Sequence, residues 1–117
     1  MEPAMAPPLA LVAPTEAMAA RDKAVQLGNA QQVYFYGRQL QTQKKKDEAI
    51  AVYRSVAQRF PDHWLGHLAK ARAAVADADF TTAMKEAQAA QSAAPEPQKS
   101  QLDALKKRIE AKEDINS

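Results

Sequence analysis

Cysteine is absent from this 117-residue sequence, and aromatic residues make up only 6% of it. Without cysteine the chain has no disulfide, no thiolate nucleophile and no cysteine-based metal site, whereas reducing and oxidising compartments both stay compatible. Hydrophobic residues still reach 46%, and many of them are alanine. This composition predicts closely packed helices that meet across small side chains, and it argues against a sheet.

The net charge is small, because 16 basic and 14 acidic residues leave a balance of +2. A protein dedicated to nucleic acid would have a larger basic excess, so no nucleic-acid partner is predicted. The apolar run LALVA near the N-terminus is short, lies between prolines and has no lysine or arginine before it. It predicts neither a signal peptide nor a membrane span. If the protein is exported, its signal would lie on sequence outside this chain.

Catalytic motifs are also missing. The sequence has no glycine-rich phosphate loop, no serine in a recognisable motif with a histidine and an acid, and no paired carboxylates in an obvious pocket. We therefore predict that the protein is not an enzyme and uses no cofactor.

A spacing of 34 residues recurs along the chain. It separates three pairs of small residues or prolines, namely Gly37 and Ala71, Ala49 and Ala83, and Pro61 and Pro95. A fixed period of this size indicates stacked supersecondary units, and 34 residues is the length of one helix-turn-helix unit. The spacing therefore predicts an all-α protein built from repeated antiparallel helix pairs.

Apolar periodicity and breaking residues predict five to six helices. Their expected ranges are 15–27, 30–42, 47–60, 63–77, 80–93 and 99–112. Asp47 and Asp62 are the expected N-caps of the third and fourth of these. The predicted organisation is a flexible lead-in (1–14), a helix of an incomplete repeat (15–29), two repeat units (30–63 and 64–97) and a C-terminal capping helix with its tail (98–117).

With repeat position 1 placed at Ala30 and again at Trp64, residues 30–97 resemble the tetratricopeptide repeat (TPR) family. The small residues then fall at repeat positions 8 and 20, and the prolines at position 32. The pattern is incomplete, because lysine or alanine replaces larger apolar residues at Lys46, Lys70, Ala74 and Ala87. The resemblance implies a short right-handed superhelix whose concave face binds other proteins.

A second resemblance concerns the strings YGRQLQTQKKKDEAI, HW and KEDIN. They are similar to the C-terminal helical tail of a family of bacterial exported proteins of unassigned function, in which a β-rich domain precedes TPR units. Nothing in this chain resembles the β-rich part. This resemblance implies a fragment of a longer protein in the periplasm or cell envelope, whereas without it the expected location is cytoplasmic.

In TPR proteins, ligands commonly lie along the first helix of each unit. Carried over, the partner-binding groove would contain Gln31, Tyr34, Arg38, Gln41, Thr42, Leu65, Leu68, Arg72, Val75 and Ala76, with Lys106 beyond. Such a groove is polar to basic, with Tyr34 as its one exposed aromatic residue, and suits an acidic or amide-rich extended segment. The alternative is that Arg38 and Arg72 are ordinary solvated or ion-paired side chains. Receptors for chaperone tails have lysine and asparagine where Tyr34 and Arg38 stand, so that class is disfavoured.

Three other candidate sites have simpler interpretations. His63 and His67 are four residues apart, a spacing that can chelate zinc, but no third ligand is evident and we predict no metal. The KKK run at 44–46 is followed by Asp47 and Glu48, which favours a solvated turn over a phosphate contact. Trp64 is expected to pack between units.

The predicted function is therefore a protein-protein interaction module that presents a concave helical groove to a protein or peptide. The alternative is a structural element that self-associates or docks within a larger protein. In that case the incomplete repeat at 15–29 would pair with a second copy, because repeat units bury their apolar faces only on neighbours.

Overall fold

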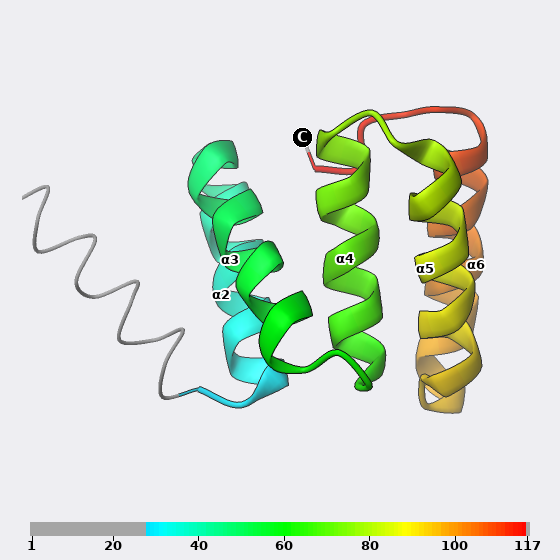
Figure 1. The fold of residues 1–117 in the computed structure, drawn as a ribbon, viewed down its shortest axis with the longest axis horizontal. Helices are drawn as coiled ribbons and strands as arrows, with labels where there is room; N and C mark the ends of the chain where they lie inside the picture. Colours follow the sequence, from blue (N-terminus) through cyan, green and yellow to red (C-terminus); the bar gives the residue numbers. More distant parts are fainter. Residues whose placement is uncertain (1–27, 117) are drawn as a thin grey trace, which may run out of the picture.

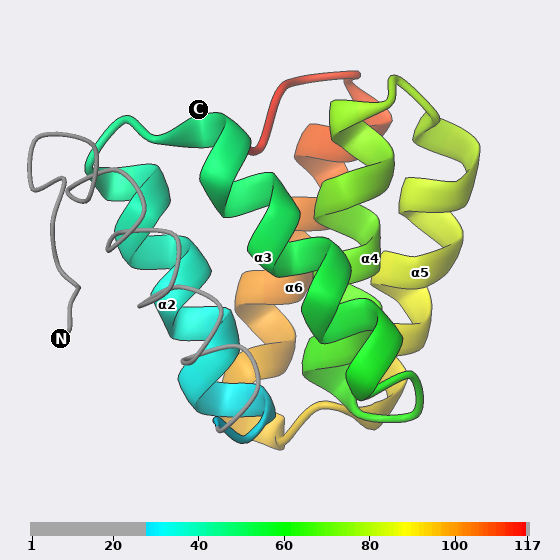
Figure 2. The same cartoon turned by 60° about the vertical axis from the view of Figure 1, so that its left-hand side comes forward.

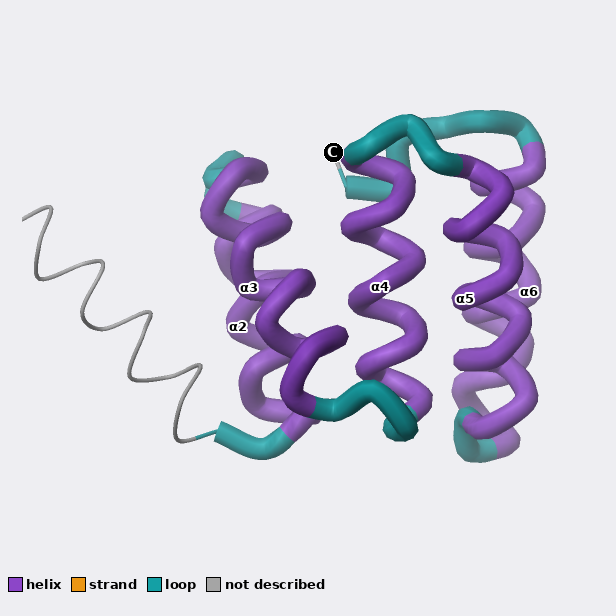
Figure 3. Tube along the Cα trace, in the orientation of Figure 1, coloured by secondary structure: helices purple, strands orange, loops and turns teal. Residues whose placement is uncertain are grey.

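The computed structural model describes residues 28–116, which form five α-helices and no strand (Figures 1 and 3). The helices are α2 (Ala30–Thr42), α3 (Lys46–Arg59), α4 (Trp64–Ala76), α5 (Phe80–Ala93) and α6 (Glu96–Glu110). The prediction of an all-α fold is confirmed. The expected lead-in at 1–14 and the expected helix at 15–27 lie outside the described residues.

Each helix packs against the next one along the chain, and α2 also contacts α4. In the view of Figure 1, α2 and α6 lie behind α3 and α5. Figure 2 shows from another side that α6 lies behind α3, in the space between α2 and α4. The three helices α2, α4 and α6 therefore share one side of the molecule, where they line a common surface.

Local hydrogen bonds explain where several helices begin. Asn29 Oδ1 accepts from the Gln32 amide at 2.8 Å while Gln32 Oε1 accepts from the Asn29 amide at 3.0 Å, a capping box that starts α2. At α4 the N-cap is His63, whose Nδ1 accepts from the Leu65 amide at 3.0 Å, so the prediction of Asp62 is wrong. The acceptor that caps this helix is therefore a histidine nitrogen in place of a carboxylate oxygen.

Two other helix starts also differ from the predictions. Asp47 lies inside the first turn of α3, where its charge suits the helix dipole, and the N-cap is Lys45. Helix α6 begins at Glu96, three residues before the predicted start. Pro97 lies in its first turn, where the missing N–H of proline costs no helical hydrogen bond.

The core consists of small and medium side chains. Val33, Val52, Tyr53 and Val56 are completely buried in its first part, and Ala71, Ala83 and Ala87 are completely buried between α4 and α5. A Cβ atom at Gly37 would lie 2.7 Å from Cε1 of Tyr53, so the absence of a side chain there lets the aromatic ring pack against α2. The helices do meet across small residues, as the composition predicted.

Within residues 28–116, no helix combines the length and the apolar character that crossing a membrane requires.

Candidate functional site

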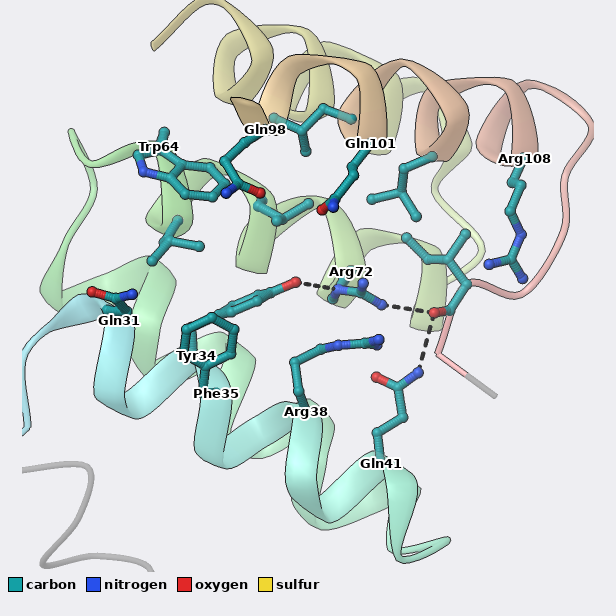
Figure 4. Close-up of a pocket in the computed structure, with 15 residues that line it drawn as sticks. Gln31, Tyr34, Phe35, Arg38, Gln41, Trp64, Arg72, Gln98, Gln101 and Arg108 are labelled. Carbon is teal, nitrogen blue, oxygen red and sulfur yellow. Dashed lines mark hydrogen bonds between the residues drawn. The ribbon is translucent and has the colours of Figure 1, made fainter. Parts of the chain in front are cut away.

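A cavity of about 470 Å³ opens between α2 and α6, with α4 behind it (Figure 4). We call it the groove. Its walls contain three arginines and four glutamines but no aspartate or glutamate. The lining residues are Gln31, Tyr34, Phe35, Arg38, Gln41, Trp64, Leu65, Leu68, Arg72, Gln98, Gln101, Leu102, Leu105, Arg108 and Ile115.

The structure brings most of the predicted partner-binding residues together in this groove. Those that line it are Gln31, Tyr34, Arg38, Gln41, Leu65, Leu68 and Arg72. Lys106 does not, because its ammonium donates to the side-chain oxygens of Gln88 and Gln91 on α5. Thr42, Val75 and Ala76 are also outside the lining, and Val75 is buried in the core.

The aromatic residue exposed at the groove is Phe35, and the prediction of Tyr34 is wrong. Tyr34 is only 4% exposed, whereas Phe35 is 54% exposed. The sequence runs Tyr34, Phe35, Tyr36, and three consecutive helical residues cannot all point to one side. The sequence therefore indicates that these three rings differ in exposure. Only the packing of α3 and α4 against α2 decides which ring is exposed. Trp64 is half-buried, packs against the core and also lines the groove.

Arg72 lies at the back of the groove and is only 6% exposed. Its Nε donates to the Tyr34 hydroxyl at 2.8 Å, and its Nη1 donates to the main-chain carbonyl of Ile115 at 2.7 Å. The guanidinium carbon also lies 5.5 Å from the centre of the Tyr53 ring and 5.9 Å from that of Tyr34. Arg72 is therefore neither solvated nor ion-paired within the described part of the chain, and that alternative is wrong for this residue.

Tyr53 and Gln41 extend this hydrogen-bond network. The Tyr53 hydroxyl donates to Gln41 Oε1 at 2.7 Å, and Gln41 Nε2 donates to the Ile115 carbonyl at 3.3 Å. Burial raises the pKa of Tyr53, so its phenol stays protonated and can donate. Two side chains from different helices, Gln41 and Arg72, thus converge on one carbonyl oxygen, as the dashed lines in Figure 4 show.

Arg38 differs from Arg72, because it is only half-buried and its side chain points into the groove (Figure 4). It forms no ion pair with a carboxylate among residues 28–116. Arg108, the third groove arginine, is already engaged, since its Nε donates to Glu113 at 3.1 Å. Arg38 is therefore the groove cation best placed to meet an incoming anion.

The C-terminal segment, residues 111–116, closes one end of the groove, and sequence reasoning missed this. Ile115 is 2% exposed and Asn116 is 1% exposed. Asn116 Nδ2 donates to the Arg72 carbonyl at 2.8 Å, and the exposed side chains of Lys46 and Asp114 form an ion pair. The available signal was an isoleucine that stands alone in a polar stretch beyond the helix.

The ion pair between Lys46 and Asp114 is expected to make the stability of the protein depend on pH. The hydrogen bond from Lys46 lowers the pKa of Asp114 below its ordinary value of 3.8. Since the folded-state pKa is depressed, the stabilising contribution is present above 3.8 and is lost as the pH falls below that value. In Lys46→Gln, we expect the pKa of Asp114, measured by carboxyl-carbon NMR, to rise toward 3.8. Lys107→Gln is the control, and an equal rise there would contradict the assignment.

Both histidines and Lys46 of the alternative sites have structural partners. His63 caps α4, and His67 Nδ1 lies 2.8 Å from Glu86 Oε1. Across residues 28–116, no cluster of three or more His, Asp or Glu side chains has the geometry of a metal site. In the KKK run, Lys44 has a φ of 65° in the turn and Lys46 pairs with Asp114.

No family model, no curated protein and no solved structure matches this chain. Inferences about its function therefore rest on the residues and geometry described above. The groove is distinguished by two arginines, Arg38 and Arg72, that form no ion pair among residues 28–116, and by its amide-rich walls.

Proposed function

We propose that the chain is a TPR-like interaction module that binds an extended, acidic peptide segment in the groove. The observation that carries this proposal is the charge of the groove, which has three arginines and no acidic residue in its lining. A buried arginine without a carboxylate partner is costly, because the charge has lost its hydration without gaining a counter-ion. Arg72 is such a residue.

The groove also offers what a peptide main chain needs. Gln31, Gln98 and Gln101 are polar wall residues with no hydrogen bond from their side chains among those described, and each amide can both donate and accept. Leu65, Leu68 and Leu102 give the groove an apolar floor for one ligand side chain. A strand-like peptide would use these amides along its main chain and direct a carboxylate toward Arg38.

Selection from a random octapeptide library on the immobilised 117-residue chain tests the proposal. We expect aspartate and glutamate to be enriched over lysine and arginine in the recovered peptides, together with at least one large apolar residue. The reason is that only an anion offsets the uncompensated groove charge. Recovery no better than from a surface without protein, or enrichment of basic peptides, would refute the proposed function.

A matched pair of arginine variants locates the binding surface. Arg38→Gln is expected to weaken binding of the most enriched octapeptide about tenfold or more, because a charge-assisted hydrogen bond is lost. Arg54→Gln is the control, since Arg54 is exposed, pairs with Asp77 and does not line the groove. Fluorescence anisotropy with the labelled octapeptide measures both. Equal affinities for the two variants would place the ligand elsewhere.

A further inference from the structure

The C-terminal segment already lies at one end of the groove, with turns at residues 111–112 and 115–116. It follows α6, passes the end of α4 and brings Ile115 between α4 and α2 (Figures 1 and 4). The contact is made by main chain, because the Ile115 carbonyl accepts from both Arg72 and Gln41. Both side chains belong to the groove lining.

The Ile115 carbonyl oxygen lies beside Arg72 and Gln41, the position that the oxygen of an acidic ligand would take in the proposed function. The neutral Ile115 carbonyl accepts a hydrogen bond from Arg72 Nη1 but leaves the positive charge of Arg72 uncompensated. A carboxylate oxygen at the same place would make a charge-assisted hydrogen bond, which is roughly twice as strong as a neutral one. A ligand carboxylate therefore has an advantage over the segment at this position.

We propose that residues 111–116 are a built-in competitor for the groove, and that an acidic ligand displaces the Ile115 carbonyl from Arg72 when it binds. This inference rests on the proposed function. The segment would lower the affinity for weak ligands, since only molecules in which it has left the groove can bind fully. Ligands with a well-placed carboxylate would overcome it.

The contacts of the segment differ in strength. Past Glu110 the chain is no longer helical, and Lys112, with a φ of 60°, helps to cap α6, because the Lys112 and Glu113 amides donate to the Ile109 and Arg108 carbonyls. The ion pair between Lys46 and Asp114 is exposed to solvent, where such pairs contribute little. Asn116 Oδ1 is buried and has no hydrogen-bond partner among residues 28–116, which opposes the docked state. The contacts that hold the segment are burial of the Ile115 side chain and the hydrogen bonds that Ile115 and Asn116 form with Arg72. A ligand carboxylate at Arg72 would have to replace these hydrogen bonds.

A purely structural role for the segment predicts the opposite behaviour. If residues 111–116 only supported the groove, loosening them would disturb Arg72 and weaken ligand binding. If they compete with the ligand, loosening them strengthens binding. The sign of the change in affinity therefore distinguishes the two roles.

The test uses the full chain with Asp114→Ala and, separately, Ile115→Ala. Asp114→Ala removes the pair with Lys46 and the acceptor of the Asn116 amide, whose hydrogen bond is 2.9 Å. Asp114 does not line the groove, but its charge interacts with that of Arg108, so Ile115→Ala, which leaves the charge unchanged, is the variant that isolates the loosening. Asp103→Ala on α6 is the control, because Asp103 is also exposed and paired with a lysine, so the net charge changes equally. The probe is the most enriched acidic octapeptide from the selection, with affinity measured by fluorescence anisotropy.

We expect both loosened variants to bind the octapeptide about three- to tenfold more tightly than wild type, whereas Asp103→Ala stays within twofold. We also expect saturating octapeptide to speed amide hydrogen exchange at Asn116 in the wild-type chain. If Asp114→Ala binds the octapeptide as tightly as wild type or more weakly, the proposal that residues 111–116 compete with the ligand is refuted. The same holds if amide exchange at Asn116 does not change. In either case the proposed function of the groove is unaffected. If no octapeptide binds any version, the proposed function fails and the competitor with it. Thermal melts confirm that each variant is folded.

Discussion

Arg72→Ala is expected to lower the free energy of unfolding by about 3 kcal/mol, although arginine is ordinarily a surface residue. The substitution removes the donor to the Tyr34 hydroxyl and the nearer of the two donors to the Ile115 carbonyl, which keeps Gln41. A buried polar group that loses its partner costs about 1–3 kcal/mol, and the removed side chain also leaves a void. Removing a desolvated charge offsets part of this loss, which is why the expected value is below the sum of the separate costs.

Urea denaturation of Arg72→Ala and Arg54→Ala measures this effect. Arg54 pairs with Asp77 at 2.9 Å, but the pair is exposed, so we expect Arg54→Ala to change stability by less than about 1 kcal/mol. Equal destabilisation by the two substitutions would mean that the buried network around Arg72 contributes no more than an exposed ion pair.

The second large effect is expected at Gly66, a position that helix propensity alone would misjudge. Replacing a helical glycine with alanine ordinarily stabilises a helix by about 1 kcal/mol. In this chain, a Cβ atom at Gly66 would lie 1.7 Å from the carbonyl oxygen of Phe60. That oxygen belongs to the main chain of the turn before α4 and accepts from the His63 amide, so it cannot move without disrupting the turn. We therefore expect Gly66→Ala to destabilise the protein by about 3 kcal/mol, at the upper end for overpacking.

Gly37→Ala provides the comparison for this prediction. Its Cβ atom would meet the Tyr53 ring at 2.7 Å, and a side chain can shift where a main-chain carbonyl cannot. We expect a smaller loss than at Gly66, measured for both variants by thermal and urea denaturation. A rise in the melting temperature of Gly66→Ala would show that propensity outweighs the close approach of the turn.

The proposed function gives a physical reason for the polar character of the groove. Arg72 draws on Tyr34 and the Ile115 carbonyl for hydrogen bonds, yet its charge stays uncompensated in the described chain. A binding site that holds its cation in place before the ligand arrives loses less conformational entropy on binding. In the proposed competition, an anion would replace the neutral Ile115 carbonyl at Arg72.

The sequence by itself determined the helical class, most helix boundaries and the residues of one groove wall. These are local properties: Asn29 caps α2 through a residue three positions away, and Gln31, Tyr34, Arg38 and Gln41 share a helix side because of the helical repeat. Small residues at fixed spacing likewise indicated where helices meet. None of this requires contacts between distant parts of the chain.

Tertiary structure alone decided the rest. The choice between Tyr34 and Phe35 as the exposed ring, the position of Lys106 on α5 and the constraint on Gly66 all depend on neighbouring elements. The docking of Ile115 depends on Arg72 and Gln41, which lie 43 and 74 residues away along the chain. Periodicity within a helix places a side chain on one side of that helix. Whether the side chain meets solvent, another helix or the chain's own C-terminal segment is decided only when distant segments compete for the same buried space.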